Sequence, residues 1–102
     1  MYAVNKLLWW ILAGSAGGLN RGRILEQLFK RPQNAHELAQ LLVLDYKTIR
    51  YHLRVLEKNR LIISIGSEYG KNYFPSVLLE ENQAYFDEIW NEIGKKHKKG
   101  KR

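Results

Sequence analysis

The chain has 102 residues, the length of a single domain, and carries a net charge of +7 with no cysteine. The absence of cysteine excludes disulfides, thiolate metal sites and cysteine nucleophiles, and it fits a reducing cytoplasm. The basic balance favours a polyanionic partner.

Residues 1–13 are predicted to form a helix that is apolar on nearly all sides. Its run LLWWILA, residues 7–13, is shorter than the ~20 residues needed to cross a bilayer, so we expect a buried helix and no membrane partner. Such a helix must be covered on more than one side. A second subunit is the favoured cover, and the alternative is that the C-terminal helix covers it within one chain.

The glycine-rich cluster 14–18 ends this helix, and Asn20 is the predicted N-cap of a second helix over 21–30. Arg21 and Arg23 are expected on its outer face, either against phosphate or in solvent. Pro32 stops the helix. Its predicted core stripe consists of Ile24, Leu25, Leu28 and Phe29.

Two capped helices follow. Asn34 and Glu37 have the spacing of a capping box for a third helix over 35–42, with Leu38, Leu41 and Leu42 as its buried face. Val43 and Leu44 form a turn, and Asp45 caps a fourth helix over 46–59. The buried stripe of the fourth helix is Ile49, Leu53 and Leu56.

The C-terminal third begins with a hairpin. Strands are predicted over 61–65 and 71–74, and two strands alone are marginal, so this hairpin must lie against the helices. A last helix starts near Ser76 and is expected to end at Gly94. Residues 95–102 hold six of the seventeen lysines and arginines. We expect a folded domain over 1–94 and a basic disordered tail over 95–102.

This order of elements predicts a mainly α protein with a small β-hairpin, and it resembles a winged helix-turn-helix flanked by N- and C-terminal dimerisation helices. The flanking helices supply the apolar surface expected for a homodimer. The expected interface residues are Leu8, Trp9, Ile11, Leu12, Phe86, Ile89, Trp90 and Ile93.

Residues 48–56, TIRYHLRVL, match the recognition-helix pattern TVxxHLxxL of ArsR-type regulators, and residues 7–75 resemble archaeal members in particular. The resemblance implies a transcriptional regulator that binds duplex DNA in a sequence-specific manner. The chain lacks the cysteines of metal-sensing members, and its histidines have no paired carboxylates, so no metal site is implied. The family usually has glycine at the position of Arg60, and Asn59 is expected to take the left-handed conformation instead.

A recognition helix presents its N-terminal residues to base edges in the major groove. Arg50 or Lys47 is expected to donate to guanine, Arg54 to meet phosphate, and Lys71 of the hairpin to reach the minor groove or flanking phosphates. His52 is expected to be packed and hydrogen-bonded. The full set of expected DNA-binding residues is Tyr46, Lys47, Thr48, Arg50, Tyr51, Arg54 and Lys71, with Tyr69 and Asn72 as further hairpin candidates and Glu68 opposing them.

Two other functions are alternatives to DNA-binding regulation. The first is a winged-helix module that binds protein through Trp9, Trp10 and Trp90 and has no operator. The second is an enzyme, which the sequence disfavours because no catalytic triad, phosphate loop, cofactor motif or carboxylate pair is found.

Overall fold

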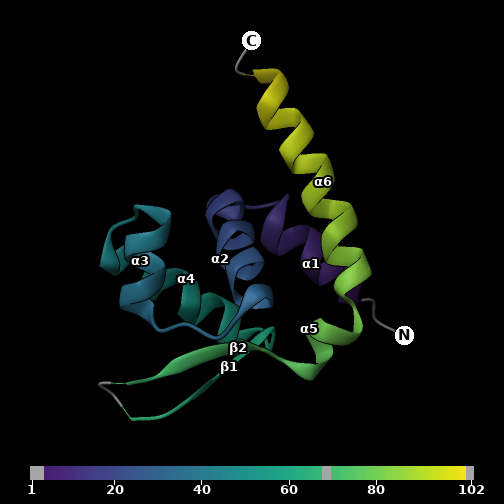
Figure 1. Cartoon of the computed structure of the whole chain (residues 1–102). Coiled ribbons are helices and arrows are strands. Elements are labelled where there is room, and N and C mark those ends of the chain that lie inside the picture. The colour runs from purple at the N-terminus through teal and green to yellow at the C-terminus, as the bar shows by residue number, and fades with distance from the viewer. Residues whose placement is uncertain (1–3, 68–69, 101–102) are drawn as a thin grey trace.

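The computed structural model describes residues 4–67 and 70–100, with side chains described as far as residue 94. Six helices and two strands follow one another in this part of the chain (Figure 1). They are α1 (Val4–Leu12), α2 (Gly18–Lys30), α3 (Ala35–Leu42), α4 (Tyr46–Lys58), β1 (Ile62–Ile65), β2 (Asn72–Pro75), α5 (Val77–Glu81) and α6 (Gln83–Gly100). The predicted fold class is confirmed: α3 and α4 form a helix-turn-helix, and the antiparallel β1–β2 hairpin is its wing.

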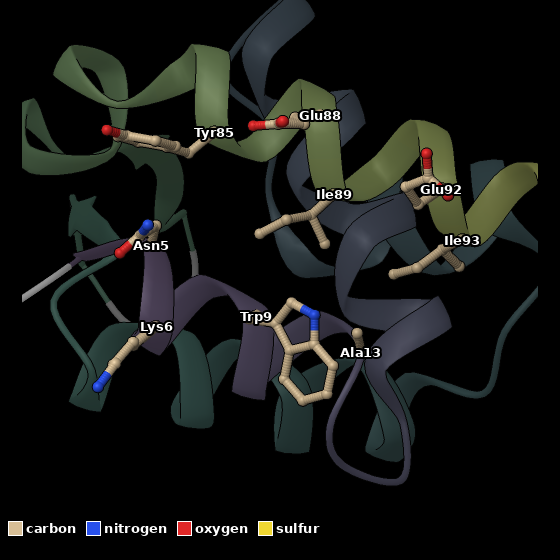
Figure 2. A pocket seen from close by; sticks show the side chains of 9 residues that line it. All are labelled: Asn5, Lys6, Trp9, Ala13, Tyr85, Glu88, Ile89, Glu92 and Ile93. Atoms are coloured by element: carbon tan, nitrogen blue, oxygen red, sulfur yellow. The ribbon is translucent and has the colours of Figure 1, made fainter.

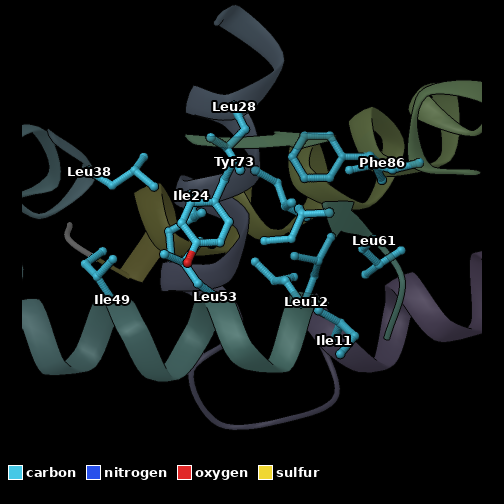
Figure 3. Close-up of a cluster of buried hydrophobic side chains, with 14 of the residues drawn as sticks. Ile11, Leu12, Ile24, Leu28, Leu38, Ile49, Leu53, Leu61, Tyr73 and Phe86 are labelled. Carbon is cyan, nitrogen blue, oxygen red and sulfur yellow. The ribbon is translucent and has the colours of Figure 1, made fainter. Parts of the chain in front are cut away.

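The core lies where the apolar faces of the helices meet around α2 (Figure 3). Ile24, Leu25 and Leu28 of α2 are buried, as are Ile49, Leu53 and Leu56 of α4. These two predicted stripes are therefore confirmed, whereas Phe29 is only partly buried against the core. The third helix was predicted less well, because Leu38 and Leu42 are buried but Leu41 is 52% exposed.

The wing lies against the helices, as its short length requires. Tyr73 of β2 is 5% exposed and belongs to the core. Its backbone N–H donates to the Gln33 carbonyl at 2.9 Å, and the Gln33 N–H donates to the Tyr73 carbonyl at 3.4 Å. This pair of hydrogen bonds fixes β2 to the segment between α2 and α3, and so helps to hold the wing beside α4.

The two predicted caps of the helix-turn-helix are confirmed. The Asn34 side chain accepts from the Glu37 N–H at 2.8 Å, while the Glu37 carboxylate accepts from the Asn34 N–H at 2.9 Å. The Asp45 carboxylate accepts from the N–H groups of Lys47 and Thr48 at 3.0 and 3.3 Å. These bonds satisfy N–H groups that the first helical turn leaves unpaired, so each helix begins at a fixed residue.

The start of α2 differs from the prediction. The N-cap is Gly17, in the left-handed conformation with φ of 85°, and Asn20 lies inside the helix. An ideal Cβ on Gly18 would lie 2.0 Å from the Leu12 carbonyl oxygen, so only glycine allows the end of α1 to approach the start of α2 this closely. This contact between two stretches of backbone starts α2 three residues before the predicted Arg21.

The end of α4 also differs. Asn59 has φ of −90°, and Arg60 is the residue with positive φ, at 62°. The Asn59 side chain donates to the Val55 carbonyl at 2.8 Å, which holds Asn59 close to helical geometry. The turn out of the helix therefore falls on Arg60, the position at which the resembling family has glycine.

The C-terminal region consists of two helices rather than one. Ser76 caps α5, and the Asn82 side chain donates to the Leu78 carbonyl at 2.8 Å where α5 gives way to α6. Helix α6 continues to Gly100, so the predicted helix end at Gly94 and the disorder expected over 95–100 are wrong. The lysines that follow Gly94 have good helix propensity, which one glycine does not cancel. Residues 101–102 of the expected tail, like residues 1–3 of the first predicted helix, lie outside the described residues.

Candidate nucleic-acid interface

Helix α4 separates its side chains into a buried and an exposed set. Ile49, His52, Leu53 and Leu56 are buried. The residues predicted to contact DNA lie on the other faces: Tyr46, Lys47, Arg50, Tyr51 and Arg54 are exposed, and Thr48 is partly exposed. With Lys58 in its last turn, α4 thus presents four basic and two aromatic side chains to solvent, while its apolar stripe anchors it to the core.

The wing and the start of α3 meet this helix at a pocket of about 440 Å³. Lys71 of the wing lines it together with Arg50 and Tyr46 of α4. The structure therefore brings these three predicted residues together, and Lys47, Thr48, Tyr51 and Arg54 lie outside the pocket. Tyr69 and Glu68 of the wing loop fall outside the described residues. The full lining is Asn34, Ala35, His36, Tyr46, Arg50, Lys71 and Tyr73.

Aromatic and basic side chains are in contact at this pocket. The His36 ring stacks on the Tyr46 ring with centroids 4.3 Å apart and planes inclined by 14°. Arg50 donates from Nη1 to the Tyr46 hydroxyl at 3.0 Å. The sequence alone indicates no role for His36, because it lies on a polar face of α3. Its contact with Tyr46 depends on how α3 and α4 cross, which the sequence pattern does not show.

His52 is packed and hydrogen-bonded, as predicted. It is 5% exposed, and its Nδ1 lies 3.3 Å from Nη1 of Arg21. A guanidinium has only donors, so Nδ1 accepts and the imidazole is neutral, with its proton on Nε2. Burial lowers the pKa of His52, and the nearby charge of Arg21 lowers it further.

Arg21 was expected on the outer face of its helix and is instead 3% exposed. Its guanidinium donates to the Ile11 carbonyl at 3.0 Å, the Ser15 hydroxyl at 2.6 Å and the Ala16 carbonyl at 3.0 Å. Burial lowers its pKa. Neither phosphate nor solvent is therefore its partner: Arg21 joins the end of α1 to α4. The missed signal is the cluster of residues 14–18, whose carbonyls and hydroxyl can receive a guanidinium.

Arg23 also has a structural role. It is partly buried, and it donates from Nη2 to the Leu42 carbonyl at 2.8 Å and from Nη1 to the Asn20 side chain at 3.1 Å. A cation is favourable at the C-terminal end of a helix, where carbonyls are left unpaired. Arg23 therefore fixes the end of α3 to α2, while part of its side chain stays in contact with solvent.

Half of the residues expected at the dimer interface lie inside the protomer. Leu8, Ile11, Leu12 and Phe86 are at most 2% exposed. The reason is that α6 packs on α1. For these residues the C-terminal helix of the same chain, and not a second subunit, provides the cover, which was the alternative expectation. Trp90 is also used internally: it stacks on Phe86 with centroids 6.1 Å apart and lies over Gly22, where a Cβ would be 2.1 Å from its ring.

The other expected interface residues surround an open groove of about 580 Å³ between α1 and α6 (Figure 2). Ile89 and Ile93 of α6 point toward Trp9 of α1, which is 57% exposed. Trp10 beside it is 56% exposed. Asn5, Lys6, Ala13, Tyr85, Glu88 and Glu92 complete the lining.

Two other kinds of feature are missing from the described part of the chain. Its His, Asp and Glu side chains form no group of three or more that is arranged to hold a metal ion. None of its helices combines the length and the apolar character needed to cross a membrane.

Residues 20–64 match the model of the family described as "Bacterial regulatory protein, arsR family". The match extends from α2 to β1 and includes the whole helix-turn-helix. It supports a DNA-binding transcription regulator. No curated protein and no solved structure matches the chain in the corresponding comparisons.

Proposed function

We propose that the protein is a homodimeric transcriptional regulator that recognises a specific duplex DNA sequence by placing α4 in the major groove. The observation that carries the proposal is the division of α4, inside the matched residues 20–64, into a buried apolar stripe and an exposed basic and aromatic surface. The resemblance to archaeal members also remains a proposal, because part of it rests on residues 7–19, which lie outside the matched residues 20–64.

Each exposed residue is assigned a role by its chemistry and position. Lys47 and Arg50 lie in the first half of α4 and donate to guanine O6 and N7, for which a good bidentate contact is worth ~1–3 kcal/mol of discrimination. Thr48 and Tyr51 bind phosphate or pack on a thymine methyl. Arg54 and Lys71 bind backbone phosphates, which contribute affinity without sequence information.

The proposal is tested by DNA binding measured at two salt concentrations, with a genomic fragment selected by the protein and an unrelated duplex. Arg50→Ala is expected to weaken binding to the selected fragment by ~1–3 kcal/mol and to affect the unrelated duplex less. Lys58→Ala is the matched control, since it removes a charge from an exposed residue in the last turn of α4. Equal losses on both duplexes would show that Arg50 does not read bases.

For the homodimer, we propose the groove between α1 and α6 as the interface, centred on Trp9, Ile89 and Ile93. The exposed Trp10 follows Trp9 in the chain. The support is that two large indoles are more than half exposed in a 102-residue chain. Sedimentation of the intact chain at micromolar concentration is expected to give a dimer, and Trp9→Lys a monomer. Val77→Lys, a change of a 68% exposed residue on α5, should leave the dimer intact. A monomeric unaltered chain would contradict the proposal.

A second function is favoured by the same two tryptophans. They would serve equally as the contact surface of a winged-helix module that binds another protein and has no operator. The DNA-binding measurement separates the two functions: absence of duplex binding by the unaltered chain even at low salt would reject the regulator and leave the interaction module.

A further inference from the structure

We propose that His36, which lies outside the recognition helix, is a specificity-determining residue that positions Arg50 through Tyr46. The inference rests on the proposed function, because it concerns how the DNA-reading side chain is held. In this arrangement Tyr46 is a positioning residue rather than a DNA contact.

The first contact joins two helices. His36 is the second residue of α3, and Tyr46 is the first residue of α4. Their rings are nearly parallel, at 14°, with centroids 4.3 Å apart. Stacking of this kind contributes free energy beyond the burial of area. The phenol of Tyr46 is therefore held against α3 instead of moving freely at the helix start.

The second contact passes from the phenol to the arginine. Tyr46 and Arg50 are four residues apart and lie on the same face of α4. The Tyr46 hydroxyl accepts from Arg50 Nη1 at 3.0 Å, and the guanidinium carbon lies 5.7 Å from the centroid of the Tyr46 ring. The guanidinium is thus directed by both the hydroxyl and the ring.

The consequence for recognition is preorganisation. A free arginine side chain loses rotamer entropy when it binds a base edge, and a side chain already held in place loses less. Base contacts carry the discrimination between sequences, whereas phosphate contacts do not. Loosening Arg50 should therefore reduce the preference for the operator and leave binding to unrelated DNA nearly unchanged.

The experiment measures the ratio of the dissociation constants for an unrelated duplex and for a fragment selected by the unaltered chain. His36→Ala is expected to lower this ratio about three- to tenfold, the range for removal of one aromatic pair. His36→Phe keeps a ring at the same place and should stay within about twofold of the unaltered chain. Gln40→Ala, at another exposed position of α3, is the control and should leave the ratio unchanged.

The double variant decides whether His36 acts through Arg50. In an Arg50→Ala background, His36→Ala should cause no further loss, because the side chain that it positions is absent. If His36→Ala caused the same loss in both backgrounds, His36 would contact DNA directly and the inference would be overturned. A loss in His36→Phe as large as that in His36→Ala would also overturn it, and so would an unchanged ratio in His36→Ala. If the unaltered chain binds no duplex, the proposed function fails and the inference fails with it; if it binds but His36→Ala has no effect, only the inference fails.

Discussion

In the described part of the chain, two residues other than glycine have left-handed backbone conformations, and each stands where a helix ends. Val43, at the end of α3, has φ of 55°, and Arg60, after α4, has φ of 62°. For residues with a Cβ this conformation costs about 1–2 kcal/mol. It is retained because the following N–H groups can then bond to the last carbonyls of the helix: Leu44 donates to Ala39 at 3.0 Å, and Leu61 donates to Leu56 at 3.0 Å.

Replacing Arg60 by glycine should relieve this cost. We expect Arg60→Gly to raise the free energy of unfolding by roughly 1 kcal/mol, measured by urea denaturation. The neighbouring change Asn59→Gly is the control and should destabilise, because φ at Asn59 is −90° and its side chain bonds to the Val55 carbonyl. An Arg60→Gly protein no more stable than the original would mean that the turn is not strained.

The buried His52 predicts a dependence of stability on pH. Its pKa is lowered from the ordinary value of 6.5, so between the two values the unfolded chain binds more protons than the folded one. The free energy of unfolding should therefore be highest above pH 6.5 and fall as the pH drops through the folded pKa. Denaturation series in His52→Gln, which cannot protonate, should lack this component. The same slope in both proteins would exclude His52 as its source.

At the scale of elements, the sequence predicted both strands and every helix except the division of the last one into α5 and α6. It succeeded where the signal is local, as in the capping box of Asn34 and the apolar stripe of α4. It failed at junctions. The start of α2 is set by contact of Gly18 with the Leu12 carbonyl, and no periodicity within either helix encodes a contact between two backbones.

The α1–α2 junction can be tested with two glycines. Gly18→Ala should destabilise the protein by about 1–3 kcal/mol, since its Cβ would lie 2.0 Å from the Leu12 carbonyl oxygen and the backbone must move. Gly94→Ala, inside α6 with nothing within 4 Å of its Cβ position, should instead stabilise by up to about 1 kcal/mol. Thermal unfolding of both variants gives the comparison, and a stability unchanged by Gly18→Ala would refute the close packing of the junction.

For the whole molecule, the exposed basic and aromatic face of α4 could be predicted, whereas the division of the flanking helices into buried and exposed residues could not. A helix that is apolar all round does not reveal that Leu8 is buried while Trp9 is 57% exposed. That assignment depends on where α6 crosses α1. The role of Arg21 was hidden for a similar reason, because its acceptors come from residues 11, 15, 16 and 52 and are brought together only by folding.

The charge of the C-terminal segment predicts a salt effect. Truncation after Gly94 removes six of the seventeen lysines and arginines and should weaken both specific and non-specific DNA binding. It should also flatten the plot of log K against log salt concentration, by about 0.9 for each phosphate that the protein no longer neutralises. Changing the four lysines at 95, 96, 98 and 99 to glutamine keeps the chain length and should flatten the plot too. Unchanged slopes in both proteins would show that the segment does not bind DNA.

The hydrogen bonds of Arg21 have a geometric consequence. They tie the last turn of α1 to the middle of α4, so α4 cannot tilt without breaking a buried contact. In a dimer formed through α1 and α6, the two copies of α4 would then stand at a fixed separation. Arg21 would then determine how many base pairs lie between the two half-sites, although it contacts none of those base pairs.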